Sequence, residues 1–264
     1  MISPLPVAPH CGATLRLEPG PRGYRYNLDA FLLAEFADLP GQTLVADLGT
    51  GSGVVGVLLA LRYPQLRVVG IDLQWDLLRL AADNARNSGL AGRFKGVRAD
   101  LRQTRAWARP GRFHAAVINP PYRKVGTGRL SPDPARAMAR HEVTLDLPAW
   151  LEAARHLIAP GGRLFVTHLA EREDEVVRRM GEKGFVLWKI RRVHPFEGTP
   201  PSTVLLEARR EGVNPGNSSE RRSSLGPGNS PQEVPPLIVY REPGLYTEEI
   251  RGMYKGFELE MLGG

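Results

Sequence analysis

Short apolar runs alternate with runs of helical spacing along most of the chain. Buried strands are predicted at residues 43–48, 67–72, 93–99, 114–118 and 163–169. Helices are predicted at 27–39, 54–62, 76–87, 147–158 and 171–183, and two strand-like runs at 185–193 and 203–208 complete the series as a hairpin. Repeated strand–helix–strand units of this length predict a Rossmann-like α/β fold, with a mostly parallel sheet and helices on both faces.

The end of the chain departs from this pattern. Between residues 212 and 236, 17 of 25 residues are Gly, Pro, Ser or Asn. Such a segment buries too little apolar surface to order itself, so we expect a flexible, disordered loop. Residues 237–240 and 246–254 are typical of a strand fragment and a short helix. We therefore expect a single domain with an N-terminal lid and helix at 1–42, a core at 43–211, the loop, and a returning segment at 237–264.

Composition narrows the class of protein. Of 264 residues, 42% are hydrophobic and 24% are charged, which excludes wholesale disorder. One cysteine, Cys11, and six scattered histidines give neither a disulfide nor metal-ligand spacing, so we expect a reducing compartment and no metal. Residues 1–10 lack the basic start of a secretory signal and no apolar run approaches about 18 residues, so we expect no membrane contact and a cytoplasmic location.

Glycines dominate the turn between the strand at 43–48 and the next helix. The turn contains Asp47, Gly49, Thr50, Gly51 and Gly53. Glycines let the backbone turn tightly and approach a ligand at a helix N-terminus. The next strand ends in Asp72, which is placed to accept hydrogen bonds from ribose hydroxyls. The pattern fits a nucleoside cofactor, and the structural alternative is an ordinary turn that holds nothing.

Three details favour S-adenosylmethionine over NAD as that cofactor. The carboxylate of Asp47 suits a ligand that carries an ammonium and a sulfonium better than one that carries a pyrophosphate. Asp100 follows the strand at 93–99, where a polar side chain can meet an adenine amine. The glycine turn also does not stand at the start of the chain.

A second motif, Asn119-Pro120-Pro121-Tyr122, follows the strand at 114–118. Ligands of open α/β sheets bind beyond the carboxyl ends of the strands, so this tetrapeptide should lie beside the cofactor. The prolines fix the backbone and leave carbonyl oxygens and the Asn119 side chain as rigid acceptors. Two acceptors that grip the N–H groups of an sp² amine would aim its lone pair at a sulfonium methyl, while Tyr122 stacks on an extruded base. The alternative is that the motif only ends a strand and Tyr122 packs.

Positive charge gathers around this motif. Residues 101–132 include no acid and seven basic residues, Arg102, Arg105, Arg109, Arg112, Arg123, Lys124 and Arg129. With a net charge of +7, they are expected to bracket the strand end and attract a phosphate-rich substrate, although a solvated basic face is the alternative. The connection at 124–146 should cover the substrate, with Arg123, Lys124, Arg140 and His141 as contacts, unless His141 is a local structural partner.

At these residues the chain resembles the class I S-adenosylmethionine-dependent methyltransferases and, within them, the bacterial tRNA1(Val) adenine-37 N6-methyltransferase family. The resemblance includes residues 24–30, 47–53, 119–145 with the run Ala139-Arg140-His141-Glu142, 235–240 and 246–250. It covers most of the chain. The first residues match poorly, and the insertion before Pro235 departs from the family pattern.

The resemblance implies a seven-stranded sheet and methyl transfer from S-adenosylmethionine to N6 of adenosine 37 in a tRNA. It implies that the cofactor is lined by Asp29, Asp47, Gly49, Thr50, Gly51, Gly53, Asp72, Asp100 and Asn119. Asp29 belongs to the segment that closes over the cofactor. Asn119, Pro120, Pro121 and Tyr122 would hold the adenine.

Three other hypotheses stay open. The first is methylation of a glutamine amide in a release factor, although only about 40 residues precede Asp47 and such enzymes usually carry a helical domain there. The second is methylation of guanine N2 in ribosomal RNA, against which Tyr122 and the Arg-His-Glu run argue mildly. The third is a non-catalytic RNA-binding module with a vestigial cofactor pocket. The sequence does not indicate an oligomeric state.

Overall fold

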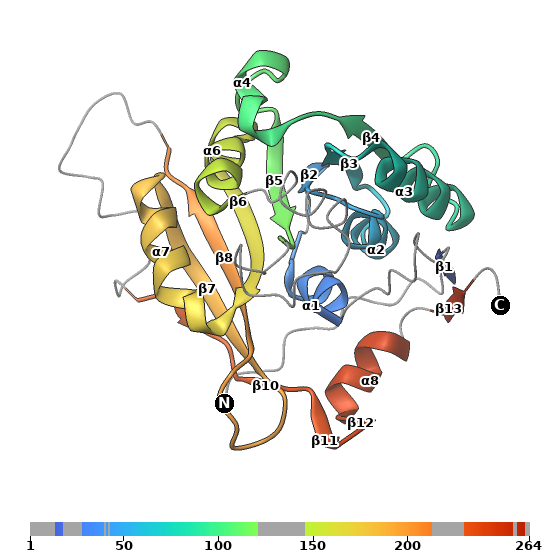
Figure 1. The fold of residues 1–264 in the computed structure, drawn as a ribbon, viewed down its shortest axis with the longest axis vertical. Helices are drawn as coiled ribbons and strands as arrows, with labels where there is room; N and C mark the ends of the chain where they lie inside the picture. Colours follow the sequence, from blue (N-terminus) through green and yellow to red (C-terminus); the bar gives the residue numbers. More distant parts are fainter. Residues whose placement is uncertain are drawn as a thin grey trace, which may run out of the picture.

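A mostly parallel sheet of nine strands organises the described part of the chain (Figure 1). The computed structural model describes residues 14–17, 28–39, 41, 43–120, 146–212, 230–255 and 258–261. The strands of the sheet are β2 (Leu44–Leu48), β3 (Arg67–Asp72), β4 (Phe94–Arg98), β5 (Phe113–Ile118), β6 (Ile158–Leu169), β7 (Phe185–His194), β8 (Thr203–Arg210), β9 (Gln232–Glu233) and β10 (Leu237–Ile238). Their order is β10-β7-β8-β6-β5-β2-β3-β4, with β9 on β7, and β8 is antiparallel to both of its neighbours.

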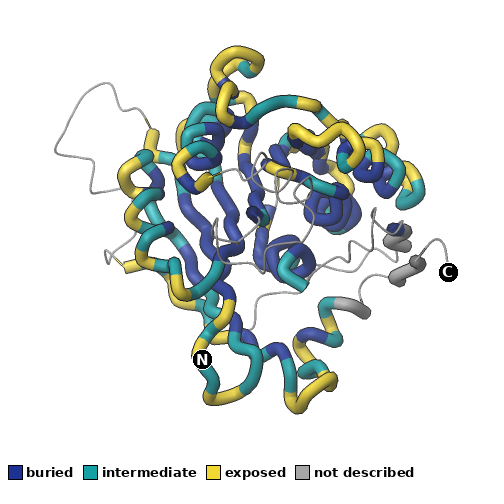
Figure 2. The backbone as a smooth tube through the Cα atoms, viewed as in Figure 1, coloured by how far each residue is buried: buried dark blue, intermediate teal, exposed yellow. Residues whose placement is uncertain are grey.

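Helices cover both faces of this sheet, and its central strands are buried (Figure 2). Alternate residues of a strand join different cores. On β5, Ala115 and Val117 join a core with α1 (Leu28–Phe36), α2 (Val54–Arg62) and α3 (Trp75–Asn87). The intervening Ala116 and Ile118 join a second core with α6 (Leu147–Leu157) and α7 (Glu173–Glu182). This alternation is the side-chain period of two that a strand buried on both faces requires.

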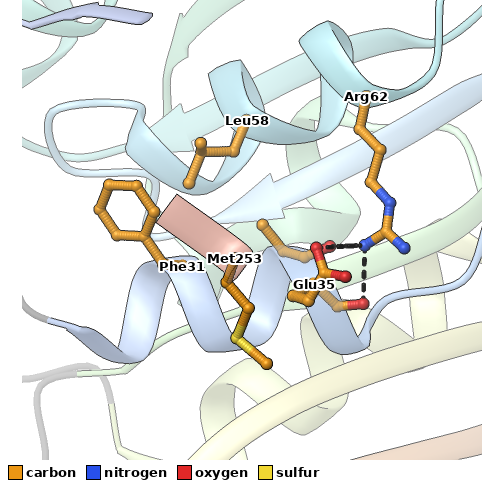
Figure 3. Close-up of a pocket in the computed structure, with 6 residues that line it drawn as sticks. Phe31, Glu35, Leu58, Arg62 and Met253 are labelled. Carbon is orange, nitrogen blue, oxygen red and sulfur yellow. Dashed lines mark hydrogen bonds and ion pairs between the residues drawn. The ribbon is translucent and has the colours of Figure 1, made fainter. Parts of the chain in front are cut away.

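Short elements complete the described chain. They are β1 (Thr14–Leu17), the 3₁₀ turns η2 (Leu101–Gln103) and η3 (Ala170–Arg172), α4 (Thr104–Trp107), β11 (Tyr240–Glu242), β12 (Leu245–Tyr246), α8 (Glu248–Lys255) and β13 (Glu258–Met261). β1 and β13 pair in parallel. A small cleft between α1, α2 and α8 is lined by Phe31, Ala34, Glu35, Leu58, Arg62 and Met253 (Figure 3). Met253 thus places the C-terminal helix against the face of α1 and α2.

The structure confirms the predicted α/β class and corrects it in three places. The sheet has nine strands instead of seven, because β9 and β10 extend it along β7. Disorder throughout 212–236 is therefore wrong at Gln232 and Glu233, whereas residues 213–229 lie outside the described chain. Ile158, predicted to end a helix, begins β6 and pairs with Phe113.

Candidate active site

The carboxyl ends of β2, β3 and β5 lie together at the centre of one sheet edge. Leu48 at the end of β2 is in register with Ile71 of β3 on one side and Ile118 of β5 on the other. The chain proceeds from β2 to β3 in one direction and returns to β5 in the other. This is a topological switch point, where the two outgoing connections diverge and leave a crevice for a ligand. The glycine turn leaves β2 here, and Asn119 and Pro120 leave β5.

Left-handed backbone shapes the glycine turn. Gly49, Gly51 and Gly53 have φ angles of 66°, 55° and 80°. A Cβ on Gly53 would stand 2.8 Å from Cβ of Ala81, so this glycine lets α2 start close against α3. A Cβ on Gly49, by contrast, would meet nothing within 4 Å. Gly49 therefore has no packing reason to be glycine, and the open space before its backbone is what an approaching ligand requires.

Asp47 holds the turn from inside. The residue is 2% exposed, and its Oδ2 accepts hydrogen bonds from Thr50 Oγ1 at 2.6 Å and from the Gly56 amide at 3.1 Å. Burial raises the pKa of this carboxyl to about 6, against the opposing effect of these two donors. The described contacts of Asp47 thus pin the turn to the first turn of α2, and contact with a ligand ammonium stays a prediction.

Asp72 lies beside the same turn at the end of β3. Its Oδ2 accepts a hydrogen bond from the Gly51 amide at 2.9 Å, and its Oδ1 accepts one from the Gln74 amide at 2.9 Å. Each carboxylate oxygen can accept a further hydrogen bond, so Asp72 can still receive ribose hydroxyls. These residues fit a nucleoside cofactor, because an acceptor and an open glycine backbone face the same strand end.

Asp100 follows β4 and is engaged more fully than predicted. Arg102 donates to both of its carboxylate oxygens, with Nη2 2.7 Å from Oδ2 and Nε 2.9 Å from Oδ1. This side-chain contact holds the pKa of Asp100 below its ordinary value. An adenine amine of the cofactor would have to share the Asp100 carboxylate with the Arg102 guanidinium. Asp100 can therefore accept from that amine only through the lone pairs that Arg102 leaves unused.

Sequence reasoning missed Asn84 as a further support of the turn. Asn84 is fully buried in α3, and its Nδ2 donates to the Ser52 carbonyl at 2.9 Å. The available signal was a polar residue on the apolar face of an amphipathic helix, between Ala81 and Ala85.

The second motif is described only at its start. Asn119 is half-buried and Pro120 is buried, directly after β5. Pro121, Tyr122, Arg123, Lys124, Arg129, Arg140 and His141 lie outside the described residues. The sequence-based roles of these seven residues stay predictions.

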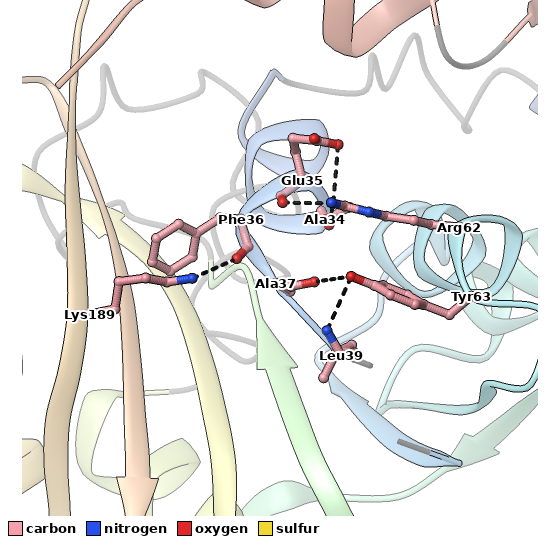
Figure 4. A network of polar contacts seen from close by, with 8 residues as sticks. All are labelled: Ala34, Glu35, Phe36, Ala37, Leu39, Arg62, Tyr63 and Lys189. Carbon is pink, nitrogen blue, oxygen red and sulfur yellow. Dashed lines mark hydrogen bonds and ion pairs between the residues drawn. The ribbon is translucent and has the colours of Figure 1, made fainter. Parts of the chain in front are cut away.

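Asp29 stands in the first turn of α1 at the same sheet edge. The opposite end of α1 is fixed near the amino edge, where Arg62 Nη1 donates to the Glu35 carbonyl at 2.7 Å and Tyr63 Oη donates to the Ala37 carbonyl at 3.2 Å (Figure 4). Arg62 and Tyr63 end α2, which starts at the glycine turn. Phe31 lies one turn before Glu35 on α1, Leu58 lies one turn before Arg62 on α2, and all four line one cleft. α1 therefore runs alongside α2, and its N-terminus with Asp29 points toward the glycine turn. Burial raises the pKa of Asp29.

The prediction that the seven basic residues bracket the strand end at Asn119 is partly wrong. Arg109 and Arg112 precede β5 and lie at its amino end, whereas Asn119 follows its carboxyl end. Arg112 and Asn119 flank β5 and are seven residues apart, which at a strand rise of about 3.3 Å puts them roughly 23 Å from each other. Arg102 pairs with Asp100, and Arg105 pairs with Glu152 at 2.8 Å. The sequence identifies the basic residues but does not show at which end of β5 each of them lies.

The described residues contain neither a membrane-spanning helix nor a cluster of metal ligands. None of their helices is long and apolar enough to cross a membrane. Within the same part of the chain, no three His, Cys, Asp or Glu side chains gather closely enough to hold a metal ion.

Comparison with known proteins gives the family context of this site. Residues 29–177 match the family model described as methyltransferase small domain. A tRNA1(Val) (adenine(37)-N6)-methyltransferase from Tolumonas auensis is 31% identical over 67% of this chain and 73% of its own length. A protein of the same name from Actinobacillus pleuropneumoniae is 26% identical over 90% of this chain and 91% of its own.

Solved structures agree at the level of fold. A predicted O-methyltransferase from Agrobacterium tumefaciens superposes with a TM-score of 0.62 and 20% identity, over 89% of this chain and 99% of that one. TrmN from Thermus thermophilus has a TM-score of 0.50 and 26% identity, over 69% of this chain and 48% of that one. The described strands and helices thus form a Rossmann-like core that these structures share.

Proposed function

Because the chain belongs to the methyltransferase small domain family, we propose that it methylates N6 of an adenosine in tRNA, at position 37 of a tRNA of the valine type. The chain is a methyltransferase whose cofactor is S-adenosylmethionine. The tRNA substrate and the position come from the names of its relatives.

One observation carries the proposal. Leu48 and Ile118 are register partners on adjacent parallel strands, so the glycine turn and Asn119-Pro120 leave the sheet side by side. Adjacent strands lie roughly 5 Å apart, which puts a cofactor on the turn within reach of an amine held after β5. Had the two motifs followed distant strands, they would have served separate sites.

S-adenosylmethionine, when bound, supplies a methyl group on a sulfonium. In the proposed mechanism, Gly49 and Gly51 present their backbone to it, and Asp72 accepts hydrogen bonds from its ribose. The side-chain oxygen of Asn119 and the Pro120 carbonyl accept hydrogen bonds from the two N–H groups of the adenine amine. These hydrogen bonds keep the nitrogen lone pair pointed at the methyl group. Tyr122 stacks on the extruded base and offsets part of the cost of unstacking it.

Substitution of Asn119 tests this assignment. With Asn119→Ala, we expect kcat for methylation of an unmodified tRNA transcript to fall by 100-fold or more, since one oriented acceptor is worth about 10²–10³ in rate. Binding of S-adenosylhomocysteine, measured by calorimetry, should fall far less than kcat, because the glycine turn and Asp72 supply most of the proposed cofactor contacts. Asn87→Ala, at the last residue of α3, is the matched control and should change neither quantity. Equal losses of kcat and of S-adenosylhomocysteine affinity would make Asn119 a structural residue.

A panel of acceptors separates this function from its rivals. Unmodified tRNA, ribosomal RNA and release factor are each offered with methyl-labelled cofactor. Label in methyladenosine of tRNA supports the proposal, whereas label in guanine or in glutamine assigns one of the other reactions. Tight RNA binding without a thermal shift by S-adenosylhomocysteine would indicate a binding module that has lost catalysis.

A further inference from the structure

Exposed apolar side chains concentrate beside the cofactor end of the sheet. Among the described residues, four large apolar side chains are exposed, and three of them follow β3 or β4. They are Leu73, Trp75 and Trp107, which are 37%, 55% and 37% exposed. The fourth, Leu245, is 45% exposed and belongs to β12. Large exposed aromatic side chains lower solubility. Clusters of exposed apolar side chains therefore mark interaction sites more often than other parts of a protein surface do.

The chain after β3 carries Trp75, and a hydrogen bond to a residue after β4 holds Trp107. Trp75 is the first residue of α3, two positions beyond Leu73, whose carbonyl accepts from Arg98 Nε at 3.2 Å. Trp107 ends α4, and its indole Nε1 donates to the Asp100 carbonyl at 3.0 Å. Trp107 is thus fixed by its polar edge while part of its ring faces solvent.

Arginines accompany these aromatic rings. Arg79 is exposed one helical turn after Trp75, on the same side of α3, and Arg98 is exposed at the end of β4. The exposed acid of this region is Asp76, and Asp100 is already paired with Arg102. Aromatic rings with unscreened guanidinium groups match bases and phosphates of a single-stranded nucleic acid. A second copy of this chain is disfavoured as the partner, because a symmetric contact would place the same positive charges against one another.

We propose that Trp75, Trp107, Arg79 and Arg98 form a docking surface for unpaired nucleotides of the RNA substrate. This tryptophan surface rests on the proposed function and deepens it. β2 alone separates β3 from β5, so the end of β3 lies roughly 10 Å from the strand that carries Asn119, and the end of β4 lies roughly 15 Å from it. One loop of RNA can therefore present an extruded base to Asn119 and stack its neighbouring bases on Trp75 or Trp107.

Binding measured on the full chain tests the surface without requiring turnover. Trp75→Ala and Trp107→Ala should each weaken the Kd for an unmodified tRNA transcript by about 5- to 100-fold, the loss expected for one stacked base. Leu245→Ala removes an equally exposed apolar side chain elsewhere and should leave the Kd within a factor of two. Affinity for S-adenosylhomocysteine should be unchanged in all three variants.

Three results would overturn the surface. They are unchanged tRNA affinity in both tryptophan variants, a parallel loss of S-adenosylhomocysteine affinity, which would assign the rings to the cofactor, and a change from dimer to monomer with tRNA affinity intact. Methyladenosine formed by the wild type, together with unchanged affinity in the variants, would reject the surface and keep the proposed function. Trp-dependent tRNA binding without any methylation by the wild type would reject the proposed reaction alone.

Discussion

At the scale of single residues, the carboxylate that opens the glycine turn supports the site from within. Asp47 is bonded to Thr50 and Gly56 inside the turn. The sequence indicated an acidic residue near the end of a buried strand, where Asp47 is the last residue but one of β2, and its contact with the cofactor stays a prediction. Its inward orientation was not predictable, because the side chain turns toward helix amides that only the folded turn places nearby.

The pKa of Asp47 gives the first prediction. Burial raises it from 3.8 to about 6, so the folded state binds the proton more tightly than the unfolded state. The resulting stability is fully present below pH 3.8 and is lost as the pH rises through about 6. Asp47→Asn does not titrate, so urea unfolding should show the wild type losing about 3 kcal/mol relative to the variant across this window. A constant difference from pH 4 to pH 7 would contradict the buried position of this carboxyl.

Gly49 gives a second prediction about the cofactor. Gly49→Ala should cost about 1–2 kcal/mol of unfolding free energy, because an L side chain is strained at a φ of 66°. The new methyl group projects into the open space before the turn, so S-adenosylhomocysteine affinity should fall at least tenfold. Gly89→Ala has the same strain, with a φ of 74° and nothing within 4 Å of the added Cβ, but lies beyond α3. Equal cofactor affinity in the two variants would mean that no ligand approaches Gly49.

At the scale of elements, a buried ion network fixes α1 to the sheet. Glu207 on β8 is 1% exposed, with Oε1 2.9 Å from Arg163 Nε and Oε2 3.3 Å from Lys189 Nζ. Lys189 Nζ lies 3.5 Å from the Phe36 carbonyl and 4.4 Å from the centre of its ring (Figure 4). The ammonium thus caps the C-terminus of α1, where the helix dipole favours a positive charge.

Removal of the shared carboxylate gives a third prediction. Glu207→Ala leaves Lys189 buried without its counter-ion and should lower the free energy of unfolding by about 3–5 kcal/mol. The double variant Lys189→Met with Glu207→Leu removes the two most deeply buried charges and leaves Arg163, whose side chain is 18% exposed, so it should recover most of that loss. Chemical denaturation of the wild type and both variants measures this. A Glu207→Ala cost below about 1 kcal/mol would show that the network does not anchor α1.

Most elements were predictable from the sequence because each carries its own periodicity. The predicted helix at 54–62 and strand at 67–72 coincide with α2 and β3. β10 lies within the strand fragment predicted at 237–240, whereas β9 was missed, because a two-residue strand has no detectable period and depends on pairing with β7, which lies some 40 residues earlier in the sequence. The start of β6 at Ile158 was missed for a related reason, since Pro160-Gly161-Gly162 is typical of a break and the pairing with Phe113 is long-range.

At the scale of the whole molecule, topology decides which motifs meet. The sequence alone predicted that the motifs after β2 and β5 lie close together, because a doubly wound sheet has its switch point between these strands. The distribution of positive charge could not be predicted from the sequence, since Arg109 and Arg112 lie close to Asn119 in sequence but at the other end of β5. Net charge describes attraction to RNA in general, and only the fold shows which arginines share the edge of the site.

Salt dependence of tRNA binding gives a fourth prediction at this scale. Arg98→Gln should reduce the slope of log Kd against log salt concentration by about 1, the value for one lost phosphate contact. The pair Arg109→Gln and Arg112→Gln should leave the slope unchanged, although it removes two positive charges. A larger change in the pair than in Arg98→Gln would place the RNA at the opposite edge of the sheet.

The direct measurement of the central claim is the chemical identity of the product. Purified protein is incubated with unmodified valine tRNA and methyl-labelled S-adenosylmethionine, and the digested nucleosides are separated by mass spectrometry. The proposed function predicts label in N6-methyladenosine, lost in Asn119→Ala and retained in Asn87→Ala. Label in any other nucleoside, or no label in a protein that binds S-adenosylhomocysteine, would contradict the account.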